Sequence, residues 1–195
     1  SFYAKTEIKD VMAYLRLIIN PSDDNALLRI INTPRRQIGP TTLEKLGEYA
    51  NQRSLSLYDV IDEVGLTASM PANNLERLKR FKHWIQKVNR NIYDSDPMAS
   101  INEMLNDADY KGWLQQNASN DHVAQKRWEN VQFLLSQLAQ ALKRDEDEYG
   151  LENGDSRIEN AIAKLILRDL LDREKEESAD DKVQLMTLHA AKGLE

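Results

Sequence analysis

The sequence contains no cysteine, which excludes disulfide bonds and thiolate metal sites. It also has no apolar run long enough to cross a bilayer, and its first residues lack the basic and apolar stretches of a secretory signal. We therefore expect no contact with a membrane and a cytoplasmic location. His83 and His122 have no second ligand at metal-site spacing, so we expect no metal site in the chain.

An overall positive charge is missing as well. The formal net charge is −6, so any contact with nucleic acid must come from local basic patches and not from the overall field. Basic residues collect in segments 29–36 and 77–90, whereas acidic residues collect in segments 145–148 and 174–181. The net charge of the whole chain does not show this separation into basic and acidic segments.

Recognisable catalytic motifs are also absent. The sequence contains no Gly-x-x-x-x-Gly-Lys-Ser/Thr phosphate loop, and no Ser-His-Asp or cysteine nucleophile arrangement can be assembled from it. We therefore expect no catalytic residue in this chain and no ATP hydrolysis by the chain alone.

Apolar residues recur at helical spacing over most of the chain. This pattern predicts a compact all-α fold of about seven to nine helices, with an exposed acidic loop over residues 145–155. Thr6 is the expected N-cap of the first helix, and Thr41 or Thr42 that of the third. The predicted helices cover residues 6–19, 23–31, 43–53, 57–64, 72–92, 99–105, 110–114, 121–144 and 158–174.

The last residues depart from this pattern. Residues 183–188 (VQLMTL) have the length of a buried strand, and they lead into a turn that carries His189, Lys192, Gly193 and Glu195. A strand needs neighbours that hydrogen-bond its edges, yet no other segment reads convincingly as a strand. We therefore expect a fragment whose terminal strand belongs to a sheet outside it. The polar cluster suits phosphate and sugar contacts, although a solvated helix start fits the spacing equally well.

A second polar segment, residues 32–42 (NTPRRQIGPTT), connects two predicted helices. Gly39 would let a phosphate approach the backbone, and the N–H groups at the start of the next helix favour an anion. Arg35 and Arg36 would add positive charge. The alternative is an ordinary interhelical turn punctuated by Gly39 and Pro40. Nothing in the segment suggests readout of base edges, so any nucleic-acid contact should have low sequence specificity.

The basic helix over residues 77–90 also has two interpretations. It could form a second phosphate-facing surface, but a solvated outer face opposite an apolar stripe is preferred. Trp84, Trp113 and Trp128 have periodic apolar neighbours, which favours core positions over base-stacking platforms.

Three segments resemble the superfamily 1 DNA helicases of the UvrD, PcrA and Rep type, in that family's order. Residues 183–195 (VQLMTLHAAKGLE) resemble motif V, and residues 1–17 (SFYAKTEIKDVMAYLRL) resemble the segment just after motif IV. Residues 32–40 resemble the family's Thr-Pro-x-Arg-x-Ile-Gly element, and the middle of the chain is most similar to Rep. Lys5 stands where relatives often carry arginine, so planar bidentate geometry is lost there.

The resemblance implies a division of the chain. In this family an all-helical insertion, 2B, interrupts the second RecA-like core domain, 2A. Residues 1–9 would be an edge of 2A, residues 10–178 the 2B-like domain, and residues 179–195 the return to 2A with motif V. Nucleotide contacts are implied for Gly193 and Glu195. DNA contacts, or coupling to DNA, are implied for Thr33, Arg35, Arg36, Ile38, Gly39, Thr41, Thr42, Thr187, His189 and Lys192.

The resemblance also implies that the parent protein is an ATP-dependent DNA helicase of replication or repair that translocates 3′ to 5′ and binds ATP and magnesium in its core. This chain would be a regulatory, duplex-contacting subdomain, without bound nucleotide, that swivels about linkers near Lys9 and Ser178. Its partners would be single-stranded and duplex DNA and the core domains missing from the chain. Self-association is compatible with the sequence. The alternatives are a freestanding helical adaptor that binds protein and the helicase part of a recombination nuclease.

Overall fold

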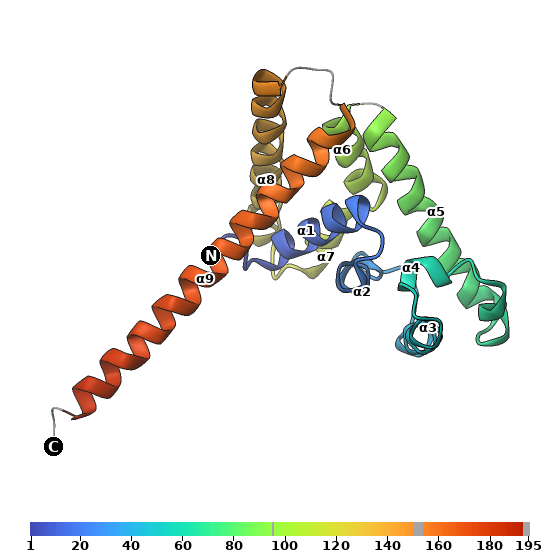
Figure 1. The fold of residues 1–195 in the computed structure, drawn as a ribbon, viewed down its shortest axis with the longest axis horizontal. Coiled ribbons are helices and arrows are strands. Elements are labelled where there is room, and N and C mark those ends of the chain that lie inside the picture. The colour runs from blue at the N-terminus through green and yellow to red at the C-terminus, as the bar shows by residue number, and fades with distance from the viewer. Residues whose placement is uncertain (95, 150–153, 193–195) are drawn as a thin grey trace.

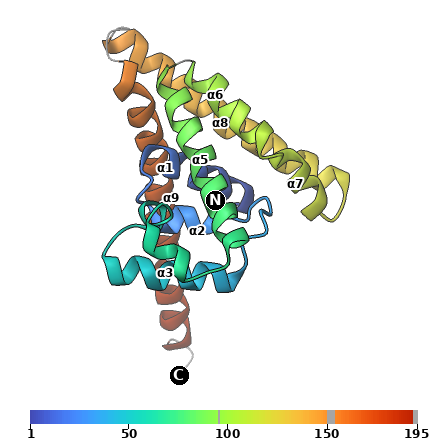
Figure 2. The ribbon, with the colours of Figure 1, turned by 90° about the vertical axis from the view of Figure 1, so that its right-hand side faces the viewer.

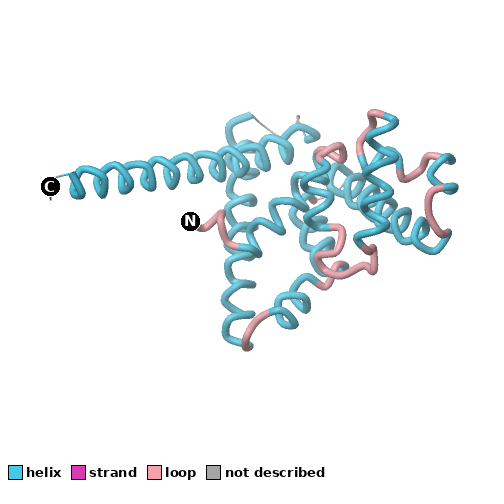
Figure 3. The backbone as a smooth tube through the Cα atoms, turned by 90° about the horizontal axis from the view of Figure 1, so that it is seen from below, coloured by secondary structure: helices cyan, strands magenta, loops and turns pink. Residues whose placement is uncertain are grey.

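The computed structural model describes residues 1–94, 96–149 and 154–192, and every regular element in this part of the chain is a helix (Figures 1 and 3). This confirms the predicted all-α fold. The elements, in chain order, are α1 (Thr6–Ile19), α2 (Asp24–Ile30), α3 (Pro40–Arg53), α4 (Leu57–Val60), the 3-10 helix η1 (Val64–Ala68), α5 (Ala72–Asp94), α6 (Pro97–Asp107), α7 (Tyr110–Asn117), α8 (Asp121–Tyr149) and α9 (Gly154–Lys192).

Helix α1 lies in the middle of the molecule, and most of its side chains are apolar and buried. Ile8, Val11, Leu15 and Ile18 are completely buried, and the helix packs against α2, α5, α8 and α9. A helix that is apolar all round must be covered on every side. One continuous core therefore extends from α1 outward to helices that are far apart in sequence.

The α2–α3 loop lies against α1 and α5, since the Thr33 carbonyl accepts from the Tyr14 hydroxyl and Arg77 donates to the Gln37 carbonyl. Helices α5 to α8 each pack against the next helix in the chain, and α4 contacts both α2 and α3. Figures 1 and 2 show α3 at the end opposite α6. Among the residues described, no helix combines the length and the apolar character that a membrane span requires.

Two of the predicted caps are wrong. Helix α1 already includes Thr6 and follows Lys5, and α3 follows Gly39; neither N-cap residue provides a capping side chain. Pro40 occupies the first turn of α3 and starts it before the two threonines, because its ring fixes φ at a helical value and the first turn needs no N–H partner. The predicted helix over residues 57–64 also divides into α4 and η1.

The acidic segment predicted as a loop is helical as far as Tyr149. Asp145 is only 3% exposed and accepts a hydrogen bond from Lys164 Nζ at 2.5 Å, and Glu146 pairs with Arg157 at 2.8 Å. These pairs join the end of α8 to α9, so the acidic side chains have partners that local composition could not reveal. The rest of the predicted loop includes residues 150–153, which lie outside the described residues.

The predicted strand over residues 183–188 is wrong for this structure, because α9 continues without a break to Lys192. A strand satisfies its backbone groups through neighbouring strands, and no strand exists elsewhere in the described residues. Helix formation satisfies the same groups within the segment itself. Lys9 and Ser178, near which the linkers were predicted, lie within helices α1 and α9. The division into residues 1–9, 10–178 and 179–195 stays a prediction.

Candidate nucleic-acid interface

The loop between α2 and α3 is closed by the side chain of Asn32. Its Oδ1 accepts hydrogen bonds from the backbone N–H groups of Arg36 (3.4 Å) and Ile38 (3.1 Å), and its Nδ2 donates to the Ile38 carbonyl. An amide side chain can serve both a donor and an acceptor of the backbone, so one residue replaces several turn contacts. The loop is thereby fixed from within.

Arg36 points into the protein. Its Nη1 donates to the carbonyl oxygens of Ile30 (2.6 Å), Ile31 (3.2 Å) and Pro34 (3.3 Å). Its Nη2 donates to the Tyr14 hydroxyl at 2.7 Å, and its guanidinium lies 5.1 Å from the ring centroids of both Phe81 and Trp84. The side chain therefore has several hydrogen-bond partners within the protein, and the DNA contact predicted at this position stays a prediction. Arg36 is therefore a support for the loop.

Three more of the predicted DNA-contacting residues make contacts within the protein or are buried. The Thr33 hydroxyl donates to the Arg29 carbonyl at 3.1 Å, and the Thr33 carbonyl accepts from the Tyr14 hydroxyl at 2.6 Å. Ile38 is 2% exposed and Thr42 is 6% exposed. Ile38 and Thr42 are therefore buried, whereas Thr33 is half-buried, and the DNA contacts predicted for them stay predictions.

Of the predicted DNA-contacting residues in this segment, Arg35, Gly39 and Thr41 are exposed, as are their neighbours Gln37 and Pro40. A Cβ added at Gly39 would meet no heavy atom within 4 Å. The N-cap of α3 provides no capping side chain, so the N–H groups of its first turn have no acceptor from the N-cap side chain. An exposed guanidinium, an open backbone position and an uncapped helix start together suit a phosphate group.

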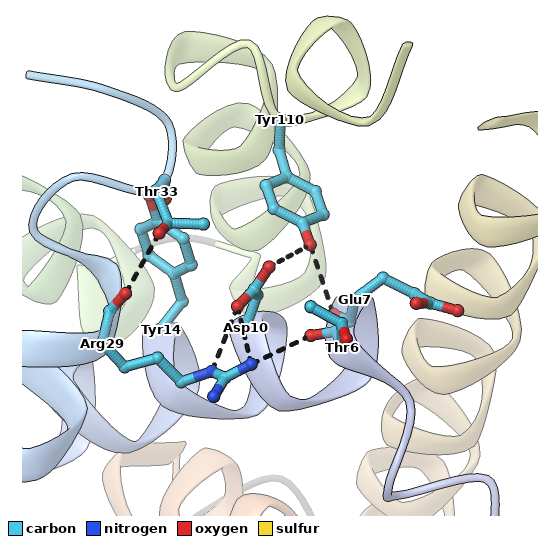
Figure 4. Close-up of polar contacts among 7 residues, drawn as sticks. All are labelled: Thr6, Glu7, Asp10, Tyr14, Arg29, Thr33 and Tyr110. Atoms are coloured by element: carbon cyan, nitrogen blue, oxygen red, sulfur yellow. Dashed lines mark hydrogen bonds and ion pairs between the residues drawn. The ribbon is translucent and has the colours of Figure 1, made fainter. Parts of the chain in front are cut away.

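A polar network around Asp10 lies next to the α2–α3 loop, and the hydrogen bond from Thr33 to the Arg29 carbonyl joins the two (Figure 4). Asp10 accepts from Arg29 Nε at 3.1 Å and from the Tyr110 hydroxyl at 2.8 Å. Arg29 also donates to the Thr6 carbonyl at 3.3 Å, and Glu7 accepts from Asn130 at 2.9 Å. Burial raises the pKa of Asp10 despite the opposing effects of Tyr110 and Arg29.

Sequence analysis did not identify this network, although a signal for it was present. Glu7, Asp10 and Tyr14 lie three and four residues apart on one face of a helix whose other residues are mostly apolar. Polar groups on a buried face need partners. The network also uses Arg29, so of the three arginines in segment 29–36 only Arg35 lacks a hydrogen bond or ion pair among the contacts of the described residues.

Only some of the basic side chains of helix α5 are exposed to solvent. Lys82 is 5% exposed, and its Nζ binds the Tyr58 carbonyl at 2.8 Å and Asp62 at 3.0 Å. Lys87 and Arg90 are exposed, as the preferred interpretation predicted. Trp84, Trp113 and Trp128 pack against the hydrophobic core and are partly buried, which agrees with the prediction that they are core residues.

The C-terminal candidate residues are not brought to the loop. Thr187 is exposed and its hydroxyl donates to the Val183 carbonyl of its own helix at 2.6 Å, and Lys192 is exposed at the end of α9. Figure 1 shows this half of α9 projecting away from the other helices, with α3 far along the longest axis. His189 lies in the helix. Gly193 and Glu195, the predicted nucleotide contacts, lie outside the described residues.

Comparison with known proteins identifies the family. All 195 residues match the model of the UvrD-like helicase C-terminal domain. The whole chain is 38% identical to the ATP-dependent DNA helicase Rep of Escherichia coli and 36% identical to the ATP-dependent DNA helicase PcrA of Bacillus subtilis. It covers 28% and 25% of those two proteins, so it spans about a quarter of their length. The chain belongs to the UvrD-like helicase C-terminal domain family.

Proposed function

We propose that this chain is the regulatory, duplex-contacting helical part of an ATP-dependent DNA helicase that translocates 3′ to 5′. The observation that carries the proposal is the α2–α3 loop, in which Arg35 and Gly39 are exposed, α3 starts without a capping side chain, and Asn32 holds the backbone in place. These groups would bind backbone phosphates, so the contact would depend on salt and little on sequence.

Family membership supports a helicase over a freestanding protein-binding adaptor, since the relatives are ATP-dependent DNA helicases by name. We propose that the helical body corresponds to the 2B insertion, and that it swivels about segments near Lys9 and Ser178 to regulate unwinding in replication or repair. A lack of change in the distance between this body and the rest of the protein, with and without DNA, would count against that motion.

ATP and magnesium would be bound by other segments of such a protein, because this chain has no phosphate loop. Within the chain, Gly193 and Glu195 are proposed to approach the nucleotide. Thr187, His189 and Lys192 are proposed to couple it to single-stranded DNA. These roles follow from the resemblance to motif V, and they require the core domains as partners. A cytoplasmic location fits such a protein.

The test of the duplex contact is the Arg35→Ala variant of the 195-residue chain, with Arg144→Ala as control. Both arginines are exposed, but Arg144 lies on α8, so the two variants lose the same charge from different places. Binding to a blunt duplex is measured over a range of salt concentrations. We expect Arg35→Ala to weaken binding and to reduce the salt slope by about 0.9, which corresponds to one lost phosphate contact. Identical isotherms for the two variants would remove the assignment.

A further inference from the structure

A hollow of about 310 Å³ lies beside the α2–α3 loop. Its walls come from the loop, from α5 and from the end of α6, and they include Arg36, Arg77, Arg80, Phe81, Trp84 and Asp107. Arg77 joins the hollow to the loop, because its Nη1 lies 3.4 Å from the Gln37 carbonyl. The hollow therefore lies next to the loop that carries the proposed duplex contact.

The arginines of this hollow are poorly neutralised. Arg77 binds only neutral acceptors, the Gln37 carbonyl and Asn74 Oδ1 at 3.3 Å, and Arg36 binds carbonyl oxygens and a phenol. Arg80 pairs with Glu76, but both side chains are at least 70% exposed, so the pair is weak. Three guanidinium groups thus face one wall carboxylate, Asp107. The net positive charge favours an anionic ligand.

The hollow also offers a flat surface. The Arg36 guanidinium lies over Phe81 and Trp84, and Trp84 is held edge-on to Tyr14 with ring centroids 6.1 Å apart. A guanidinium plane backed by aromatic rings is a surface on which a nucleobase can stack. Basic groups beside such a surface are the combination that proteins use for single strands.

We propose that this hollow holds one unpaired nucleotide of a DNA strand next to the duplex that contacts the loop. Its phosphate would lie between Arg77 and Arg80, and its base would lie against Arg36 and Trp84. The nucleotide must be unpaired, because a base within a duplex is stacked on its neighbours and cannot enter a hollow. The proposal rests on the proposed duplex contact, but it assigns a different form of DNA to a different set of residues.

The test compares two double variants of the 195-residue chain, both on α5. Arg77→Ala with Arg80→Ala removes two charges from the hollow, whereas Lys87→Ala with Arg90→Ala removes two exposed charges outside it. Each is titrated with a blunt duplex and with the same duplex carrying a single-stranded tail of about ten nucleotides, within the usual range of single-strand site sizes. Trp84 emission, with Trp113 and Trp128 replaced by phenylalanine, reports stacking at the hollow itself.

We expect the hollow variant to lose about tenfold in affinity for the tailed duplex and to bind the blunt duplex within about twofold of wild type. The control should keep the wild-type preference for the tail, and an oligonucleotide should quench Trp84. The proposal would be overturned if the hollow variant lost equal affinity for both DNAs, or if both variants lost equal affinity for the tailed duplex. It would also be overturned if an acidic aromatic peptide quenched Trp84 and DNA did not. Failure of the duplex contact is separate, since it would appear as unchanged blunt-duplex binding by Arg35→Ala.

Discussion

Arg35 and Arg36 are neighbours in the chain, but their side chains have opposite environments. Arg36 makes hydrogen bonds to three carbonyl groups and to Tyr14, whereas Arg35 is exposed. Two adjacent arginines look equivalent in sequence. The direction of each side chain depends on the closed form of the loop, which in turn depends on Asn32 and on the packing of Tyr14 and Trp84 from other helices.

This difference predicts separate effects of the two substitutions. We expect Arg36→Ala to lower the free energy of unfolding by about 3 kcal/mol, because several buried acceptors lose their donor and the rings lose a stacked cation. Arg35→Ala should change it by less than about 0.5 kcal/mol. Urea unfolding without DNA measures both values. Equal stabilities of the two variants would show that Arg36 does not support the loop.

Gly39 has an extended backbone with φ −73°, and a Cβ would meet nothing in the protein. Glycine is also a favoured N-cap residue, and the open space beside it leaves room for a ligand to approach the backbone closely. We expect Gly39→Ala to change stability by less than about 1 kcal/mol. The same variant should weaken duplex binding severalfold, as titration would show.

Gly47 provides the matched control for this substitution. It lies inside α3, where a Cβ also meets nothing within 4 Å. Gly47→Ala should stabilise the protein by about 1 kcal/mol, because alanine favours helix, and it should leave DNA binding unchanged. Wild-type affinity in Gly39→Ala would mean that no ligand approaches that position closely.

At the scale of the elements, the largest difference between sequence and structure is α9. Val183, Leu185, Met186 and Leu188 are all more than half exposed, and they do not share one face of the helix. An apolar run of this kind is typical of a strand covered on both sides. The apolar run is therefore typical of a strand between neighbouring strands, and the described part of this chain contains no strand to pair with it. The backbone of the segment forms the local hydrogen bonds of a helix instead. The helical periodicity correctly predicted α1, α2 and α5, because the apolar faces of these helices pack against other parts of the same chain.

The last part of α9 should contribute helix content without stability. The last buried side chain of the described part of α9 is Asp169, which pairs with Arg16 and Arg173. We expect deletion of residues 179–195 to lower the far-ultraviolet circular dichroism signal, while the free energy of unfolding changes by less than about 1 kcal/mol. A loss of several kcal/mol would show that this segment packs against the body.

At the scale of the whole molecule, the Asp10 network joins elements that are distant in sequence. Asp10 and Tyr110 are 100 residues apart, and their hydrogen bond connects α1 to α7, while Arg29 adds α2 (Figure 4). Burial raises the pKa of Tyr110, with the Asp10 carboxylate adding to the effect. Burial also raises the pKa of Tyr14, although Arg36 opposes it.

These shifts predict a loss of stability in alkali. A tyrosine whose folded pKa is raised binds its proton more tightly in the folded state, so its contribution is present below about pH 10 and is lost as the pH rises further. We expect the free energy of unfolding to fall above about pH 10, by at most about 1.4 kcal/mol per pH unit for each of the two residues. Urea unfolding at several pH values measures this. The decrease should be shallower in Tyr110→Phe; equal slopes would exclude a contribution of Tyr110.

The sequence by itself determined the all-α class, most helix positions and the segment where a ligand contact is proposed, because helical periodicity and the turn residues of segment 32–42 are local properties of the chain. Only the tertiary structure decided which arginine faces solvent and which carboxylates are buried. Those outcomes depend on partners such as Tyr14, Lys164 and Tyr110, which come from other elements. Local patterns cannot specify a partner that folding brings from far along the chain.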